Sequence, residues 1–326
     1  TEEGFVVIAG PHYWNKNLMI NHNKEPLDNI MFRQALAYAI DQDEFVDKSL
    51  RGYGKTASYG LISSESQWAN PDVLDYPYDP DKAKEMISSL GYELKDGIFY
   101  SNNEPLTFEV LVSMIGTGGQ STPDRDGEIL KNQLEKVGIQ VDLISLETKI
   151  VDQKVINWDF DLAISGHGGI GGDPKILYEK VIQVPGSKTS PNTARYDKSE
   201  ELNSLLDDLM HEMDPVKRQE AVFEAQNVYA RELPAISLYY PTGYYAYNPD
   251  AGVEWFYTVG GIAKGIPIPQ NKMAMIGSHA QEDGEIVQKV AAMQTTDDTQ
   301  DTPMMPLLVV FAILAAFYVK RIRRNQ

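Results

Sequence analysis

The chain has 326 residues, which is enough for two lobes with sizeable hydrophobic cores. Its 47 acidic residues outnumber its 29 lysines and arginines and give a formal net charge of −18, so nucleic acid is not expected as a partner. Cysteine is absent, which excludes disulfides, thiolate metal sites and cysteine nucleophiles.

The first two helices that the sequence predicts each begin at a recognisable cap. Asp41 and Glu44 have the spacing of a capping box, and the helix that they open is expected to stop at Gly52. Asp79-Pro80 supplies an N-cap residue and a proline for the first turn of the next helix. The apolar stripe of that helix consists of Ala83, Met86, Ile87 and Leu90, and Gly91 follows it.

Farther along the chain, strands and helices alternate. Apolar residues at every second position predict strands over 106–112 and 139–143, and the segment between them predicts a helix that ends at Gly138. Residues 160–165 predict a buried strand, and two further helices are expected over 198–212 and 215–232. This β-α-β alternation predicts an α/β lobe with a mostly parallel or mixed sheet.

A glycine-rich segment, 166–172, follows the predicted strand at 160–165 and is expected to form a loop. Ligands of open α/β sheets bind beyond the carboxyl ends of strands, and glycines there let a backbone approach a bound molecule closely. The segment lacks the Gly-Lys-Ser/Thr of a P-loop and the spacing of a dinucleotide fingerprint. A second interpretation, compatible with the first, is a turn in which Asp173 caps a helix that starts at Pro174.

Motifs for catalysis and for metal binding are missing from the sequence. The five histidines never fall at the spacing of a zinc site, and only His167 lies within the glycine-rich segment. No G-x-S-x-G elbow occurs, and with 47 carboxylates a glycosidase pair cannot be inferred from the sequence. We therefore expect a binding protein without enzymatic activity or a cofactor.

Aromatic residues with polar atoms are frequent, and such rings line many small-molecule clefts because they give a large contact area at low entropic cost. Most of them are expected in the core or at its rim, and two or three should face a solute. Tyr59 and Trp158 are the candidates for such contacts. The other aromatic residues of this kind are Tyr13, Trp14, Trp68 and those of the run 239–245.

The C-terminal segment has the pattern of a membrane anchor. Residues 304–319 carry no charged side chain, and a basic cluster follows directly at 320–324. A helix over these residues rises about 24 Å, slightly less than the ~30 Å hydrocarbon core, and the basic cluster predicts a cytoplasmic C-terminus. A buried core helix is the alternative. Residues 280–302 are acidic and predict a flexible stalk.

The other end of the chain also carries information about processing. The chain starts at Thr1 without an export signal, whereas a protein outside the cell membrane needs one. We therefore expect a mature or truncated product.

Five segments, in order over about residues 20–245, carry a family resemblance. The stretch 32–41 (FRQALAYAID) resembles a V-R-Q-A-L-x-Y-A-I-D helix, and 78–92 (YDPDKAKEMISSLGY) resembles a Y-D-P-x-K-A-K-x-L-L-x-x-A-G-Y segment. The other three are the helix-to-strand step 134–139, the strand 160–162 with the later Gly172-Asp173-Pro174, and the return segment 232–239. Together they resemble the extracytoplasmic solute-binding proteins of peptide and nickel ABC importers, in the oligopeptide/dipeptide-binding class.

The resemblance implies a two-lobed type II periplasmic-binding-protein fold, of which this chain matches the second half. It divides the chain into the end of a first lobe with a crossover (1–24), a second α/β lobe (25–235), a return segment to the first lobe (236–276), an acidic stalk (277–303) and a transmembrane anchor with a basic tail (304–326).

The implied function is to bind a peptide or peptide-like solute between the lobes and to deliver it to ABC permease subunits. The ligand-binding residues expected in this chain are Tyr59, Trp158, His167, Gly168, Gly169, Ile170, Gly172 and Asp173. Peptide-binding members carry an aspartate for the peptide ammonium where this chain has Ile170, unless the alignment slips within the glycines. A blocked peptide, an oligosaccharide or a nickel chelate assisted by His167 therefore stays an alternative. A surface hydrolase and a sensory ectodomain are alternatives of a different class.

Overall fold

The computed structural model describes residues 4–9, 14–117, 120–168 and 173–248. Its elements in chain order are β1 (Val6–Ala9), β2 (Trp14–Ile20), α1 (Ile30–Ala39), α2 (Gln42–Lys48), β3 (Gly54–Thr56), α3 (Pro80–Ser89), β4 (Glu93–Lys95), β5 (Ile98–Ser101), β6 (Glu104–Pro105), β7 (Thr107–Thr117), β8 (Gln120–Pro123), α4 (Arg125–Lys136), β9 (Gln140–Leu146), α5 (Thr148–Ile156), β10 (Leu162–Gly168), α6 (Lys175–Val181), α7 (Glu200–His211), α8 (Pro215–Glu232), β11 (Ala235–Pro241) and β12 (Tyr244–Tyr247).

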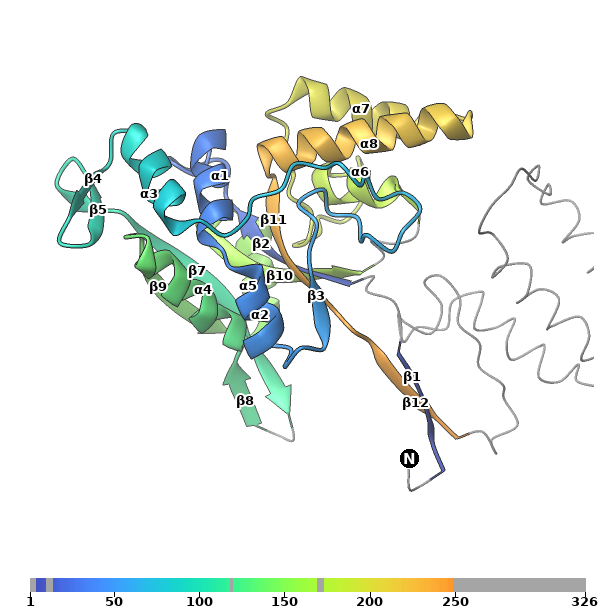
Figure 1. Ribbon diagram of the computed structural model, residues 1–326, viewed down its shortest axis with the longest axis horizontal. Helices are drawn as coiled ribbons and strands as arrows, with labels where there is room; N and C mark the ends of the chain where they lie inside the picture. The colour runs from blue at the N-terminus through green and yellow to red at the C-terminus, as the bar shows by residue number, and fades with distance from the viewer. Residues whose placement is uncertain (1–3, 10–13, 118–119, 169–172, 249–326) are drawn as a thin grey trace, which may run out of the picture.

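A mixed sheet of seven strands forms the centre of the fold (Figure 1). Its strands run in the order β3-β11-β2-β10-β7-β8, and β9 also pairs with β7. β7 is parallel to β9 and to β10, whereas β2 is antiparallel to β10 and to β11. The mixed α/β sheet that the sequence predicts is therefore confirmed.

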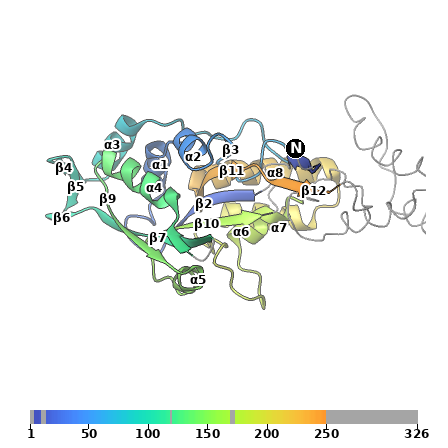
Figure 2. The ribbon, with the colours of Figure 1, turned by 90° about the horizontal axis from the view of Figure 1, so that it is seen from below.

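Helices cover both faces of this sheet, as two views of the ribbon show (Figures 1 and 2). Alternate residues of β2 point to opposite faces, so they belong to two separate hydrophobic clusters. Leu18 and Ile20 pack with residues of α1, α2, α3 and α4, on what we call the first face. Met19 packs with residues of α5, α6, α7 and α8, on what we call the second face.

Helix caps form at the predicted residues, but part of the cap of α2 is supplied by a residue of α4. Asp79 and Asp214 cap α3 and α8, and α8 has the predicted bounds. Asp41 accepts a hydrogen bond from the Glu44 backbone N–H at 3.2 Å, which is half of a capping box. The other half is replaced, because the Asp41 N–H donates to Gln133 of α4 and the Gln133 amide donates to the Glu44 carboxylate. The start of α2 therefore depends on its packing against α4.

β10 differs from its prediction. The sequence predicts a strand over 160–165 and a loop from Gly166, but the strand runs from Leu162 to Gly168. The physical reason is non-local pairing, because residues 166–168 form an antiparallel ladder with residues 14–16 of β2. The predicted loop start is therefore wrong, and Gly166, His167 and Gly168 belong to the strand.

β1 and β12 form a separate antiparallel ribbon that extends away from the main sheet (Figure 1). Val6 pairs with Tyr247, and Ala9 pairs with Tyr244. β1 precedes β2 and β12 follows β11, and β2 and β11 are themselves neighbours in the sheet. Two segments that are far apart in the sequence therefore leave the sheet side by side.

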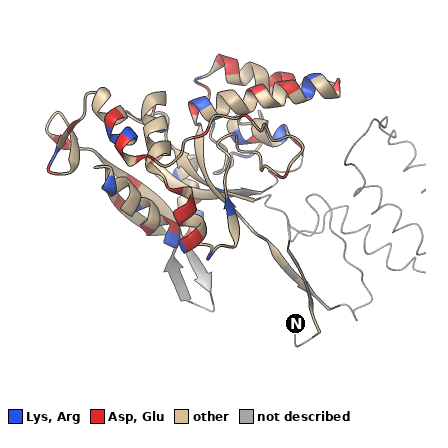
Figure 3. Ribbon diagram, viewed as in Figure 1, with Lys and Arg blue, Asp and Glu red and all other residues tan. Residues whose placement is uncertain are grey.

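Acidic residues occur on the outer helices, among them α2, α3 and α7 (Figure 3). Among the described residues, no helix combines the length and the apolar character needed to cross a membrane. The predicted stalk and anchor, residues 277–326, lie outside the described residues.

Candidate functional site

The ends of three neighbouring strands meet at one edge of the main sheet. β2 begins at Trp14 and β10 ends at Gly168, and these two residues are paired. β11 pairs with the other side of β2 and ends at Pro241. The carboxyl end of β10 therefore lies at the edge from which the ribbon of β1 and β12 departs (Figure 1).

The indole of Trp14 lies across the glycine backbone of β10. A Cβ atom placed on Gly166 would be 1.7 Å from a ring carbon of Trp14, and one placed on Gly168 would be 3.3 Å from the ring. No side chain fits at Gly166 unless the indole moves. Because 42% of Trp14 stays exposed, the ring presents a supported aromatic surface to the solution.

An ionic cluster lies on the same face of β2 as this indole. Lys16 Nζ is 2.5 Å from a carboxylate oxygen of Asp124 and 3.4 Å from one of Asp126. Asp126 also accepts hydrogen bonds from the hydroxyls of Tyr239 (2.7 Å) and Ser49 (2.5 Å). Burial raises the pKa of Asp126, against the opposing effect of the Lys16 charge. One cation is thus shared between two carboxylates close to the start of β2.

The opposite, second face of β2 is buried and polar at this end. Asn15 and Asn17 are 0% exposed, and Lys180 of α6 donates from Nζ to Asn17 Oδ1 at 3.0 Å. Within the part of the chain that the structure describes, both side-chain amide atoms of Asn15, the Asn17 Nδ2 and the Ser237 hydroxyl lack a hydrogen-bond partner. Burial lowers the pKa of Lys180 to about 7.

The structure brings two of the predicted site residues to this edge. Gly168 pairs with Trp14, and the backbone of His167 pairs with Asn15. The remaining predicted residues of this segment lie outside the described part of the chain, as does the His167 side chain; these are Gly169, Ile170 and Gly172.

Asp173 does not occupy the N-cap position that the second interpretation of its sequence predicts, because α6 begins at Lys175 and Pro174 is its N-cap residue. Asp173 still contacts this helix start, since its Oδ1 accepts a hydrogen bond from the Lys175 backbone N–H at 2.9 Å. The same oxygen is 3.1 Å from the Arg218 guanidinium. The ligand contact expected of Asp173 stays a prediction.

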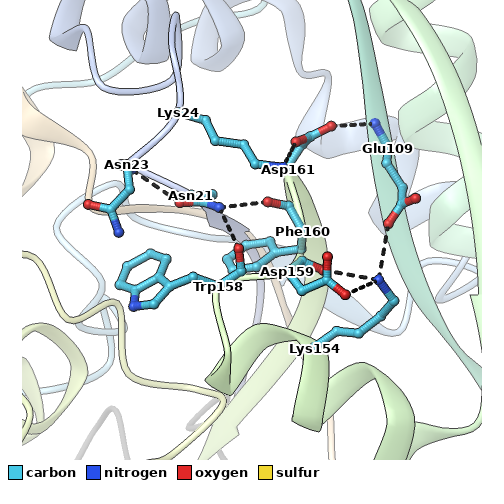
Figure 4. Close-up of polar contacts among 9 residues, drawn as sticks. All are labelled: Asn21, Asn23, Lys24, Glu109, Lys154, Trp158, Asp159, Phe160 and Asp161. Atoms are coloured by element: carbon cyan, nitrogen blue, oxygen red, sulfur yellow. Dashed lines mark hydrogen bonds and ion pairs between the residues drawn. The ribbon is translucent and has the colours of Figure 1, made fainter.

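Trp158 lies at the other end of β10 from Gly168. It precedes the first residue of a seven-residue strand, and such a strand spans roughly 20 Å. Asn21 Nδ2 donates to the carbonyl oxygens of Trp158 (3.1 Å) and Phe160 (2.7 Å) (Figure 4). The indole stacks on the Phe160 ring, and the Arg195 guanidinium lies 3.9 Å from its ring centroid. These contacts give Trp158 a structural role, away from the Trp14 edge.

Ion pairs hold the same end of β10 (Figure 4). Asp161 pairs with Lys24 at 2.6 Å and accepts a hydrogen bond from the Glu109 backbone N–H at 2.9 Å. Lys154 pairs with Asp159 at 2.7 Å. The amino-terminal end of the strand is therefore tied to β7, to α5 and to the segment after β2.

Tyr59 belongs to the hydrophobic core. It is 2% exposed, and its hydroxyl lies 3.4 Å from the carbonyl oxygen of Ala37 and 3.3 Å from that of Tyr76. Burial raises its pKa. The ring has almost no surface to offer a solute, which argues against the ligand contact that the sequence predicts for Tyr59.

Lys180, Asn15 and Asn17 are not among the residues that the sequence predicts for the site, and Trp14 is only one of several aromatic candidates. The available signal is the strand 14–20 (WNKNLMI), which is polar in its first half and apolar in its second. Lys180 gives no signal, because a helical lysine is normally exposed.

The described histidines do not form a metal site. No cluster of three or more His, Cys, Asp or Glu side chains within the described residues has the arrangement to hold a metal ion. His22 is buried, and burial together with the Arg33 charge lowers its pKa to about 3. His211 is exposed, and its Nδ1 lies 2.8 Å from the carbonyl oxygen of Asp207.

Known proteins share both sequence and fold with this chain. Heme-binding protein A of Haemophilus influenzae is 25% identical over 71% of this chain and 40% of its own length. The peptide transport periplasmic protein SapA of Salmonella typhimurium is 25% identical over 68% of this chain and 38% of its own. The structure of NikZ from Campylobacter jejuni in complex with Ni(L-His) matches with a TM-score of 0.65 at 21% identity, over 79% of this chain and 50% of that one.

This chain therefore spans about two fifths of the length of its curated relatives and half of the solved structure. The solved neighbours are type II periplasmic binding proteins with a mixed sheet, so the predicted fold class is confirmed for the described lobe. The model of the family described as bacterial extracellular solute-binding proteins, family 5 (Middle), matches residues 1–183. With more than half of its length matched, the chain belongs to the bacterial extracellular solute-binding proteins of family 5.

Proposed function

We propose that this chain is part of the solute-binding component of an ABC importer, and that a peptide or peptide-like solute binds where β2 begins and β10 ends. The observation that carries the site is the Trp14 indole, which is partly exposed and supported by the glycine backbone of β10. An aromatic surface beside the ionic cluster of Lys16, Asp124 and Asp126 suits a solute with apolar and charged groups. Family membership supports the transport class.

The ribbon of β1 and β12 supports binding by closure of two lobes. Its two strands leave the sheet side by side at the edge that carries Trp14 (Figure 1). We propose that the first lobe joins the described lobe through this ribbon and that the solute is held between the two lobes. Closure would then present the loaded protein to the permease subunits.

The amino end of the solute is the first point at which peptide classes differ. The resemblance puts Ile170 where peptide-binding relatives carry an aspartate, and an unpaired, desolvated ammonium is costly. Free-amine dipeptides should therefore bind weakly, and Ile170→Asp should strengthen their binding by about 1–3 kcal/mol. Calorimetry with free and N-acetylated dipeptides measures this difference. Tight binding of free dipeptides by the unaltered protein would mean that another carboxylate pairs with the ammonium.

A metal chelate is the second candidate solute, because the structure of NikZ holds Ni(L-His). His167 lies on β10 next to the proposed site and offers the one imidazole of that strand. If the solute is a nickel chelate, His167→Ala should abolish nickel-dependent binding. Unchanged nickel binding by that variant would exclude His167 from the site.

The proposal places the protein at the cell membrane through residues 304–326. The supporting feature is the uncharged run 304–319 followed by Lys320, Arg321, Arg323 and Arg324. Extraction of membranes with carbonate should leave the intact protein in the pellet, and detergent should release it. Release by carbonate alone would contradict the anchor.

Native mass spectrometry of the complete protein, purified from its own host, tests the function most simply. A copurifying small solute that quenches tryptophan fluorescence and is recovered unchanged supports a binding protein. Conversion of that solute to a product would favour the hydrolase alternative, and loss of quenching in Trp14→Ala would assign the signal to the proposed site.

A further inference from the structure

We propose that Lys180, Asn15, Asn17 and Ser237 form an internal binding site for a carboxylate group on the second face of the sheet. This site lies on the other side of β2 from the Trp14 indole, and it goes beyond the proposed function because it needs no importer and no transported solute.

Lys180 places a positive charge in the buried part of this face. Its ammonium donates to Asn17 Oδ1 at 3.0 Å, and its only other partner among the described residues is Met19 Sδ at 3.4 Å. Burial is the sole cause of its lowered pKa, whereas a nearby carboxylate would act in the opposite direction. Lys180 is therefore a buried cation for which the described residues supply no counter-ion.

Several buried polar groups without hydrogen-bond partners among the described residues lie beside Lys180. Asn17 pairs with Ser237 across β2 and β11, and Asn15 lies two residues along β2, so all three share one face. The Asn17 Nδ2, the Ser237 hydroxyl and both Asn15 amide atoms are buried and have no partner among the described residues. Ser165, on the other side of Asn17, already donates to Asn192. Two of these four atoms are amide nitrogens and a third is a hydroxyl, so three can donate and only the Asn15 Oδ1 is restricted to accepting, which together with the Lys180 ammonium favours an anion.

The charge and the donors of this site determine which kind of anion it suits. A single ammonium matches a single negative charge, and the two oxygens of a carboxylate accept hydrogen bonds from an ammonium and an amide together. Asn15 follows Trp14, the first residue of β2, and Asn17 and Lys180 lie farther in. A carboxylate that enters from the sheet edge meets Asn15 first and Lys180 last.

The test uses formate as the probe and the full chain as the protein. Calorimetry at constant ionic strength should detect formate binding at pH 6, and above pH 7 the affinity should fall roughly tenfold per pH unit as Lys180 loses its proton. Other titratable groups on this side are the buried phenols Tyr229 and Tyr240, whose pKa values are raised by burial, and His167 on β10. The pH dependence should persist in His167→Gln.

A matched pair of variants on one helix isolates the buried charge. Lys180→Met should weaken formate binding at least tenfold without lowering the thermal midpoint. Lys175→Met, which removes the exposed partner of Glu179 (3.2 Å), should leave formate binding unchanged. Asn15→Ala should weaken binding about threefold to tenfold if its amide contacts the anion. Absence of formate binding in the unaltered protein, or equal affinity in Lys180→Met, would overturn the proposal.

A competition experiment between formate and dipeptides identifies the source of the carboxylate. If formate competes with a dipeptide but not with the C-terminal amide of that dipeptide, the solute itself supplies the carboxylate. If formate and the dipeptide bind together, the site holds a free small anion, and either outcome supports the site. Failure of every dipeptide to bind would count against the proposed function, while the formate result would stand.

Discussion

Two fully buried cations, Arg33 and Lys180, have very different surroundings. Arg33 donates to the carbonyl oxygens of Glu232 (2.8 Å), Leu27 (3.0 Å) and Asp28 (2.9 Å) and to the Tyr196 hydroxyl (2.9 Å), so α1 is tied to the end of α8. Lys180 has one oxygen acceptor in the described part of the chain, the Oδ1 of Asn17. The contrast indicates that a buried cation with four hydrogen bonds to the protein holds the fold, whereas a poorly satisfied one marks a place for a ligand.

The largest expected effect is a difference in stability between variants at these two positions. Arg33→Met removes the donor from three carbonyl oxygens and a hydroxyl, so it should lower the free energy of unfolding by roughly 3–5 kcal/mol. Lys180→Met removes an uncompensated buried charge and should leave stability unchanged or raise it by about 1–3 kcal/mol. Urea unfolding at pH 7 measures both, and an equal loss in the two variants would contradict the comparison.

Alkaline pH sharpens the contrast for Lys180. Its pKa is about 7 in the folded chain and 10.5 in the unfolded chain, so between these values the unfolded chain binds more protons. The stability cost of Lys180 is fully present below pH 7 and should disappear as the pH rises toward 10.5, by a few kcal/mol at most. Urea midpoints from pH 7 to pH 10, relative to Lys180→Met, should show this rise. Parallel profiles for the two proteins would show that Lys180 is not buried as a cation.

Acidic pH tests the neighbourhood of Arg33 in the same way. Burial and the Arg33 charge lower the pKa of His22 to about 3, from 6.5 in the unfolded chain. Stability from neutral His22 is therefore fully present above pH 6.5 and should be lost as the pH falls toward 3. The His22→Phe variant lacks this titration, so its unfolding midpoint should fall less between pH 6.5 and pH 4. Equal slopes would mean that His22 is accessible to protons when folded.

A smaller effect on stability is expected at the Trp14 edge. Gly166→Ala puts a Cβ where the indole now lies, 1.7 Å from a ring carbon, and the exposed ring can swing away. The variant should lose only about 1 kcal/mol of stability but should bind solute roughly tenfold more weakly. Gly168→Ala, whose Cβ would be 3.3 Å from the ring, is the matched control and should have the milder effect. A larger loss of solute affinity in Gly168→Ala than in Gly166→Ala would mean that the solute binds elsewhere.

The features that the sequence predicts correctly are local ones. Asp41, Asp79 and Asp214 cap helices through residues two or three positions away, and α8 has its predicted bounds because its cap and its following Pro234 are both adjacent. Arg33 likewise belongs to a motif that carries the family resemblance, but the motif does not predict that the guanidinium forms hydrogen bonds between α1 and the end of α8.

The features that the sequence analysis misses depend on contacts between distant segments. β10 continues to Gly168 because β2, almost 150 residues earlier, provides a pairing partner and an indole that needs glycine beneath it. Tyr59 and Trp158 are buried or held by structural contacts, and an aromatic residue type does not reveal which way its ring faces. Lys180 meets Asn17 only after α6 packs on the second face.

Calorimetric titration of the complete protein with its copurified solute, in two tryptophan variants, tests the central claim most directly. Trp14→Ala removes the supported aromatic surface and should lower solute affinity at least tenfold while changing stability little. Trp158→Phe alters the other end of β10, where the indole stacks on Phe160 and on Arg195, and should lower stability while leaving solute affinity unchanged. Unchanged affinity in Trp14→Ala, or a larger loss of affinity in Trp158→Phe, would contradict the account.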